Sequence, residues 1–574
     1  MTKIQKICVL LVSTLSSVTV VAQDISQIAK SDPLIISGAV GTRNTYYYSS
    51  GTGYSSPLSN MIYANLNISL YGISMPFSFY YTNDNTSFNY PHLSFHISPR
   101  YKNWSLHFGQ SSMNYSSYVM TMPFNGYGVE YQGDRLRFGA FYGTLRKAVN
   151  DDPTDPNARA PQYKRTGWGV KLGYGTARNY LDLYFLRAYD RLKSIDERWA
   201  NTLSPQDNLV VGLRGGLSYG SHLSLTANVA ASVLSLDKTA TIVDNDDVQR
   251  FDKIFDARYS SIARYAGDVN LNMSLTGFNA SVFYRMIQPD YTSLGTYYMS
   301  NNYHALGVNM STLLFRRLSL TASFSGQADN LSGNQLYTTR GFVYNANAST
   351  RIGSHVGLTV GYNGYRQVQS DGTAHVNDTT RVNRVMHSLY VSPSYMIAGD
   401  NLSHTISLSG NYTRNKDLNP FATGESDVTT YALGASYNLG VQSWDMDFTT
   451  SLSHQRTDGY QRQYTSDILS LTTGRNFLKE KNLSAQLTLS MCYNEVKHQM
   501  KSLSLGTDMS VGYTLNKVHV FSLTAGLCKY GDVNITQRRS GLDDTEFNVG
   551  LNYTYTFSLL EIKRRSEKKP STQE

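Results

Sequence analysis

The sequence NMIYANLNISLYGISMPFSFYY, from Asn60 to Tyr81, decides the fold because its apolar residues fall on every second position. One face carries Ile62, Ala64, Leu66, Ile68 and Leu70, and after Gly72 it continues with Met75, Phe77, Phe79 and Tyr81. Side chains alternate across a β-strand, so this period of two separates an apolar face from a polar one. Two such strands of about ten residues have the length of tilted strands that cross a bilayer. The pattern predicts a hairpin with lipid on one side and water or protein on the other.

The composition agrees with a long array of such strands. The chain has 574 residues, with 44 Tyr and 44 Gly but only 14 Pro and 16% charged residues. Tyr is favoured where an apolar ring meets lipid and its hydroxyl meets the headgroups. The mean hydropathy of −0.34 is that of a water-soluble protein. Strands that are apolar on one face only give no long hydropathy peak, so this value does not exclude a membrane protein.

The N-terminal residues 1–22 have the pattern of a signal peptide. Lys3 and Lys6 precede the apolar ICVLLVSTLSSVTVV, and VVA supplies small residues for cleavage after Ala22. We therefore expect an exported chain that begins with a short periplasmic segment, residues 23–33. This segment is too short for the plug domain of a TonB-dependent transporter, which argues against independent active uptake.

Period-two segments recur along the chain and number twenty-six. Short turns alternate with longer polar loops, of which the longest is Ser235 to Arg264. This predicts an all-β protein, a transmembrane antiparallel up-and-down β-barrel of about 26 strands (range 22–26) over residues 34–557. Residues 558–574 form a polar periplasmic tail. A soluble sandwich or propeller also alternates, but the unequal turns and the lack of a repeat of about forty residues argue against both.

The remaining cysteines are expected to be free thiols. Cys8 leaves with the signal peptide, whereas Cys492 and Cys528 lie on strands separated by one other strand. Twice the spacing between strands puts their Cα atoms about 10 Å apart. That distance is too long for an unstrained disulfide.

No metal, cofactor or catalytic site is expected. His92 and His96 are about 13 Å apart along one strand and cannot share a zinc ion. The acidic clusters that begin at Asp151 and Asp244 lack the spacing of a calcium loop, so solvated loop charge is the better interpretation. GLSYG, Gly216 to Gly220, matches the G-x-S-x-G of hydrolases, but another strand follows it where the motif requires a helix. The sequence therefore predicts no enzyme.

The net charge of +9 does not point to nucleic acid. The densest basic run, KRRSEKK, lies near the C-terminus, and no basic stripe with interleaved aromatic residues occurs elsewhere. A solvated tail is the simpler interpretation.

The polar faces of the strands define the barrel lumen and supply candidate pore-lining residues. Four cations and three anions are expected to point inward: Arg137, Lys171, Arg214, Arg285, Glu130, Asp182 and Asp268. Such an even mixture argues against a strong ion filter, and inward ion pairs mostly stabilise a wide barrel. The other lumenal residues are mainly Ser, Thr, Asn and Tyr, which suit uncharged polar solutes and equally suit water.

Two passages carry a resemblance to a known group of proteins. LSFHISPRYKNWSLHFGQSSMNYSSYVMTMPFNGYGVEYQGDRLRFGAFYG and FYRMIQPDYTSLGTYYMSNN resemble large outer-membrane β-barrel proteins of the Bacteroidota, a porin-like group without an assigned activity. The segment that ends at Phe557 resembles the C-terminal recognition strand of outer-membrane proteins, which implies the outer-membrane assembly machinery as a partner. By analogy with porins, Gln110 to Asn125 is a candidate constriction loop, and an ordinary surface loop remains the alternative.

Two functions fit these observations. The first is a porin-like passive channel for small polar solutes. The second is a non-transporting component or scaffold of a secretion, assembly or surface complex, because a lumen of this size needs filling. The expected partners are the lipid bilayer, lipopolysaccharide and possible protein partners that fill or dock on the barrel.

Overall fold

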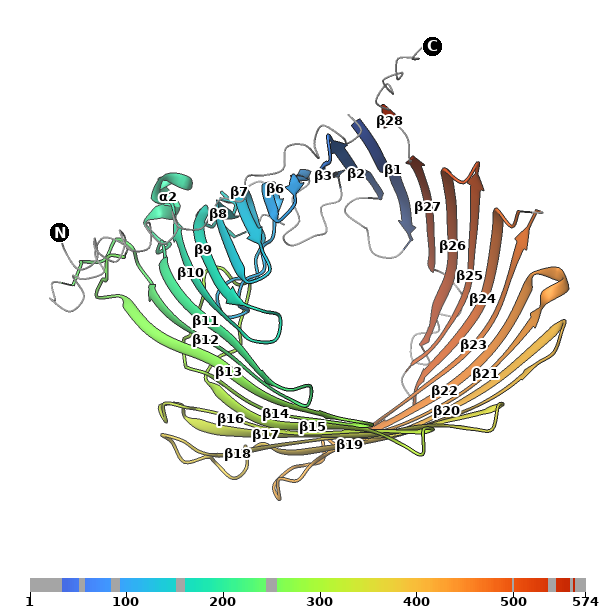
Figure 1. Ribbon diagram of the computed structural model, residues 1–574. Helices are drawn as coiled ribbons and strands as arrows, with labels where there is room; N and C mark the ends of the chain where they lie inside the picture. The colour runs from blue at the N-terminus through green and yellow to red at the C-terminus, as the bar shows by residue number, and fades with distance from the viewer. Residues whose placement is uncertain are drawn as a thin grey trace, which may run out of the picture.

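The computed structural model describes residues 34–50, 57–83, 93–150, 160–243, 255–478, 480–497, 500–534, 544–557 and 561–562. The expected signal peptide, the segment 23–33, His92 and the acidic clusters at Asp151 and Asp244 lie outside the described residues. Most of the described chain is β-strand, arranged as one ring (Figure 1).

The strands follow one another along the whole chain. The first group is β1 (Leu34–Ser49), β2 (Leu58–Leu70), β3 (Ile73–Thr82), β4 (Leu93–Ile97), β5 (Arg100–Tyr101), β6 (Trp104–Ser111), β7 (Phe124–Gln132), β8 (Leu136–Arg146), β9 (Arg165–Gly175) and β10 (Tyr180–Asp190). The second is β11 (Asp207–Tyr219), β12 (Leu223–Ser235), β13 (Ser261–Leu275), β14 (Phe278–Ile287), β15 (Tyr303–Leu314), β16 (Leu318–Asp329), β17 (Tyr337–Ile352), β18 (Val356–Asp371) and β19 (Asn383–Ala398). The third is β20 (Leu402–Asp417), β21 (Val428–Val441), β22 (Met446–Gly459), β23 (Arg462–Phe477), β24 (Leu483–Val496), β25 (Met500–Leu515), β26 (His519–Asn534), β27 (Asp544–Phe557) and β28 (Glu561–Ile562).

The ring closes by pairing its first strand with its last. β1 pairs antiparallel with β27 from Gly38 opposite Phe557 to Ser49 opposite Glu546, and with β2 on its other edge. Of the 28 strand segments, β4 and β5 share the partners β3 and β6 and count as one strand. β28 continues the edge of β27 along β1, within the segment expected to be tail. Twenty-six antiparallel strands therefore form the closed barrel, which confirms the predicted fold.

The hairpin of β2 and β3 has the predicted register. Tyr71 and Gly72 form its turn with φ values of 47° and 82°, both in the left-handed region that a two-residue hairpin turn requires. Leu66 lies opposite Phe77, so the two apolar rows share one face. Ile62 is 55% exposed on this face, as expected for a side chain that meets lipid.

Apolar side chains cover the outer face of the barrel elsewhere too. On β12, Leu223, Leu225 and Val229 are exposed, while the side chains between them point to the other face. The described chain also contains the short helix α2 (Glu197–Ala200) and the 3-10 turns Leu192–Ser194 and Gln442–Trp444. Among the described residues, no helix is both long and apolar enough to span a membrane.

Short turns gather at one end of the barrel and longer loops at the other. Tyr71–Gly72, the turn after Tyr219 and the turn after Leu275 belong to the short end, where β1 also begins and β27 ends. One connection at the long end, Tyr460–Gln461, is a two-residue turn where the sequence predicted a longer loop. In outer-membrane barrels the short turns face the periplasm, so the long end faces outward.

Two smaller expectations are confirmed. Cys492 on β24 and Cys528 on β26 are free thiols, with β25 between their strands. The GLSYG segment ends β11 and turns directly into β12, so it belongs to a hairpin.

The two faces should differ in their tolerance of charge. Leu489, near the middle of β24, is exposed on the outer face, whereas Ser490 points to the lumen opposite Gly506. We expect Leu489→Arg to lower the free energy of unfolding by about 2–4 kcal/mol, because it places a cation in hydrocarbon. Ser490→Arg should cost much less. Denaturant unfolding in lipid vesicles measures both values, and equal losses would contradict the assignment of faces.

Candidate functional site

The loop from residue 112 to residue 123 folds against the lumenal wall. Met113, Tyr115 and Val119 in this loop are buried. Lumenal glycines on β7, β8, β9 and β11 make room for them. A Cβ atom on Gly139 would lie 2.9 Å from Met113 Cε, and one on Gly212 would lie 2.5 Å from Val119 Cγ2. The candidate constriction loop therefore packs inside the barrel and is not an ordinary surface loop.

A second inward loop, residues 288–302, holds the first one in place. Tyr291 is fully buried, and its hydroxyl donates to the Tyr118 carbonyl at 2.8 Å. The Ser293 hydroxyl donates to the Val119 carbonyl at 2.5 Å. We call residues 112–123 and 288–302 together the wedge. Sequence reasoning missed the second loop, although its apolar residues, unusual for a solvated loop, were a usable signal.

Hydrogen bonds tie the wedge to the wall of β11, β12 and β13. The Tyr118 hydroxyl donates to Asp268 Oδ1 at 2.7 Å, and the Ser116 hydroxyl donates to Asn228 Oδ1 at 2.7 Å. The Leu294 amide donates to Asn208 Oδ1 at 2.9 Å. Burial raises the pKa of Tyr118 well above its ordinary value, so this hydroxyl stays a neutral donor at physiological pH.

Four of the expected lumenal charges lie together beside the wedge. Arg137 on β8 forms an ion pair with Asp182 on β10, with 2.7 Å between Nη2 and Oδ1. Arg214 on β11 lies directly opposite Asp182 in the sheet. Lys171 on β9, between β8 and β10, is 8% exposed. A buried carboxylate between cations can serve to hold neighbouring strands together as well as to select ions.

The other three expected charges lie elsewhere on the wall. Asp268 on β13 is opposite Arg285 on β14 and also accepts the hydrogen bond from Tyr118. Glu130 on β7 binds His107, with 3.0 Å between Oε2 and Nε2. All seven residues stand on the face opposite the exposed apolar rows, and their role in solute passage stays a prediction.

Glu130 is the end of a buried polar network that the sequence did not reveal. His107 Nδ1 lies 2.9 Å from the Ser98 hydroxyl, which in turn lies 2.9 Å from His96 Nε2. The order Glu, His, Ser resembles a hydrolytic triad. However, Ser98 is completely buried and its hydroxyl is held by both histidines. A substrate cannot reach it, so the network stabilises the interruption between β4 and β5.

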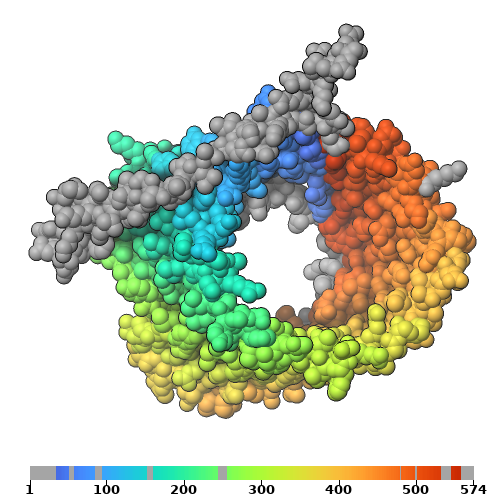
Figure 2. Space-filling view, in the orientation of Figure 1, coloured from blue at the N-terminus to red at the C-terminus, as the bar shows by residue number. Residues whose placement is uncertain are grey.

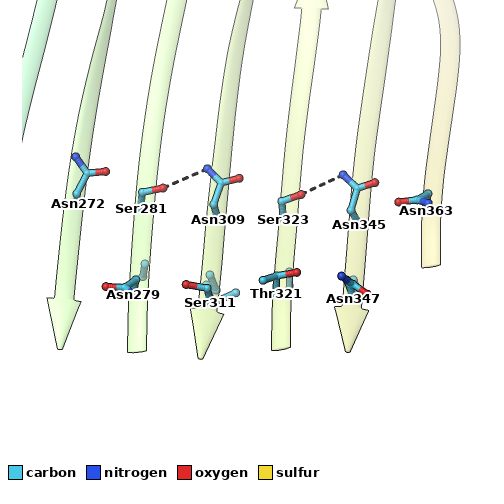
Figure 3. Close-up of a pocket in the computed structure, with 14 residues that line it drawn as sticks. Asn272, Asn279, Ser281, Asn309, Ser311, Thr321, Ser323, Asn345, Asn347 and Asn363 are labelled. Atoms are coloured by element: carbon cyan, nitrogen blue, oxygen red, sulfur yellow. Dashed lines mark hydrogen bonds between the residues drawn. The ribbon is translucent and has the colours of Figure 1, made fainter. Parts of the chain in front are cut away.

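Beyond Asp268 and Arg285, the wall of β13–β18 carries rows of uncharged polar side chains. Figure 3 shows two rows of side chains that cross these strands: Asn272, Ser281, Asn309, Ser323, Asn345 and Asn363 in one, and Asn279, Ser311, Thr321 and Asn347 in the other. Asn309 Nδ2 donates to the Ser281 hydroxyl at 3.2 Å, and Asn345 Nδ2 donates to the Ser323 hydroxyl at 3.1 Å. Each amide keeps further donors and acceptors for a solute.

An open passage runs through the centre of the ring in Figure 2. The wedge contacts the wall on one side, from β7 to β14, where it packs against Ile287 at the end of β14. In the part of the chain that the structure describes, no group of three His, Cys, Asp or Glu residues could hold a metal ion.

The closed sheet, its apolar outer face and its polar lumen define a transmembrane β-barrel of the outer-membrane type. No protein-family model and no curated protein matches the sequence. Among solved structures, OccAB2 of Acinetobacter baumannii aligns with a TM-score of 0.29 and 12% identity, covering 66% of this chain and 96% of its own. OccK8 (OprE) of Pseudomonas aeruginosa aligns with a TM-score of 0.31 and 8% identity over 68% of this chain and 98% of its own. A BenF-like porin from Pseudomonas fluorescens Pf-5 aligns with a TM-score of 0.32 and 10% identity, covering 74% of this chain and 98% of its own. Similarity this low transfers no property of those proteins to this chain.

Removing the bonds between the two loops should loosen the wedge. We expect Tyr291→Phe combined with Ser293→Ala to speed amide hydrogen exchange in residues 112–123 by about tenfold or more, because two hydrogen bonds of about 1 kcal/mol each are lost. Ser311→Ala combined with Ser323→Ala, on the uncovered wall, is the matched control and should leave this exchange unchanged. Unchanged exchange in the first variant would show that packing alone holds the loop.

Proposed function

We propose that this protein is a passive channel for small, uncharged polar solutes across the outer membrane. The open passage beside the wedge carries this proposal. Lumenal loops that narrow a barrel without filling it leave a path for diffusion. Diffusion along this path involves no chemical reaction, so the proposed function is transport without an enzymatic step.

The chemistry of the uncovered wall supports neutral solutes. Its amide and hydroxyl groups both donate and accept hydrogen bonds, so they replace the water that a polar solute gives up. The charged groups on the other side are partly engaged with one another, as in the pair of Arg137 and Asp182. A wall of this kind favours polar solutes over apolar ones without strong selection by charge.

The sequence supports the same placement. The signal-peptide pattern of residues 1–22 and the aromatic residue at the end of β27 are those of an exported barrel. The similarity to Bacteroidota proteins and the assignment of residues 558–574 as a periplasmic tail stay predictions. The assembly machinery, lipopolysaccharide and a lumen-filling protein are proposed partners.

Channel activity can be measured directly. Refolded protein in a planar bilayer should give stable, stepwise single-channel currents. Replacing residues 113–121 by a short Gly-Ser linker should increase the step size, because the wedge narrows the passage. The linker variant must first show the intact barrel by circular dichroism. Silence from folded wild-type protein would overturn the channel and favour the alternative, a barrel that serves as a scaffold or is filled by a partner.

Selectivity should change with charge on the uncovered wall. We expect the wild-type channel to show only a weak ion preference in a salt gradient. Asn309→Asp combined with Asn345→Asp should shift the reversal potential towards cation selectivity, because two carboxylates then face the passage. The control Asn65→Asp adds a carboxylate on the lumenal face of β2, outside these rows. Its reversal potential shows whether an added anion anywhere in the lumen has the same effect. An unchanged potential in the double variant would remove this wall from the conducting path.

A further inference from the structure

A basic pocket lies on the outer face of the barrel at its long-loop end. Arg366 on β18 and Arg414 and Lys416 on β20 line it together with His387 on β19. Val385, in register with both Arg366 and Lys416, connects the three strands. These residues belong to the outward-facing rows, because the alternate residues Asn363 and Thr413 belong to the polar lumenal rows. We call Arg366, His387, Arg414 and Lys416 the basic pocket.

The three cations of the basic pocket have no carboxylate partner within the described part of the chain. Asp458 on β22 shares a sheet row with Arg414, but Thr429 separates them. Asp458 is also bound by Arg456 at 2.9 Å between Oδ1 and Nε. Three unneutralised cations that converge on an outer surface favour an anionic ligand, and Arg is well suited to phosphate.

The basic pocket stands at the depth of lipid headgroups. Aromatic residues lie on the outer face nearer the middle of the strands, including Tyr344, Tyr362 and Tyr412. The His387 ring stacks on Tyr362, with 2.6 Å between Nδ1 and the Tyr362 hydroxyl. Aromatic belts of this kind mark the membrane interface. Arg366 and Lys416 lie outside the belt, where the phosphates of the outer leaflet are found.

An apolar groove continues from the basic pocket towards the membrane centre. Ala322, Ala346 and Ala348 form its floor on β16 and β17, where neighbouring strands present larger apolar residues. Met310, Leu320 and Val360 are among the residues that flank it. Tyr362 lines the groove and also contacts His387 of the basic pocket. The small floor residues leave a trough in a surface that otherwise meets lipid with bulky side chains.

We propose that the basic pocket and this groove together bind one phosphorylated glycolipid of the outer leaflet, the chemistry of lipopolysaccharide. The phosphate group lies among Arg366, Arg414 and Lys416, and one acyl chain lies along Ala346. The three cations are complementary in charge to a phosphorylated headgroup. The adjoining apolar groove fits an acyl chain, which a lipid has and a free anion lacks. This site is separate from the lumen and does not depend on channel activity.

The test measures binding of fluorescent lipid A by the full-length protein in detergent, with dephosphorylated lipid A and inorganic phosphate as competitors. Arg366→Gln, Arg414→Gln and Lys416→Gln together should weaken lipid A binding at least tenfold, since each surface cation contributes measurably to anionic headgroup binding. The matched control removes three cations from the short-turn end: Arg316→Gln, Arg317→Gln and Lys517→Gln. This control should bind as the wild type does.

A second variant tests the groove. Ala346→Trp should fill the trough and weaken lipid A binding, whereas Ala435→Trp, on the outer face of β21, should not. Circular dichroism confirms that each barrel is folded. Arg366→Lys combined with Arg414→Lys keeps the charge and should retain most binding. Full binding by the triple Gln variant, or equal competition by dephosphorylated lipid A, would overturn the proposal. Displacement by millimolar inorganic phosphate, with no effect of Ala346→Trp, would show an anion site and overturn the lipid assignment.

Discussion

The structure depends on one constraint: every backbone amide and carbonyl group in the hydrocarbon layer must be paired within the protein. A flat sheet would leave two open edges, and pairing β1 with β27 removes both. The closed ladder then fixes the alternation of side chains, because each strand has one face towards lipid and one towards the lumen. Alternate residues of one strand therefore meet different environments. On β2, Ile62 is exposed on the outer face, where it meets lipid, and Asn65 faces the lumen.

Closing twenty-six strands creates a second demand, because a ring of this size encloses a wide lumen. Two loops, residues 112–123 and 288–302, fold into the lumen and fill part of it. Glycines such as Gly139 and Gly212 leave space in the wall where the loop at residues 112–123 lies against it. Asp268 and Asn208 supply hydrogen-bond partners for the two loops. The ion pair of Arg137 and Asp182 lies beside the wedge, whereas amides and hydroxyls form two rows across β13–β18.

The outer surface is divided in the same manner along the strands. On β18, Val360 and Tyr362 meet the membrane, and Arg366 stands beyond them at the long-loop end. The outward-facing residues of this strand thus change from apolar Val360 to aromatic Tyr362 to cationic Arg366 as the depth in the membrane changes. Lumen and outer surface are independent, so a lipid held at the basic pocket requires nothing from the passage.

The sequence by itself determined the architecture, because period-two alternation is local: it is readable in β2 and β3 without knowing their partners, and the count of such segments sets the barrel size. It also placed Cys492 and Cys528 too far apart to bridge, and it put Arg137 and Asp182 on the lumenal face. The tertiary structure alone decided what depends on contacts between distant segments. Tyr291 meets Tyr118, and Ser98 meets His107 and through it Glu130, only after the strands close, since no spacing along the chain encodes a loop that turns inward. Alternation assigns a side chain to a face, but only the assembled wall decides which partner it finds there.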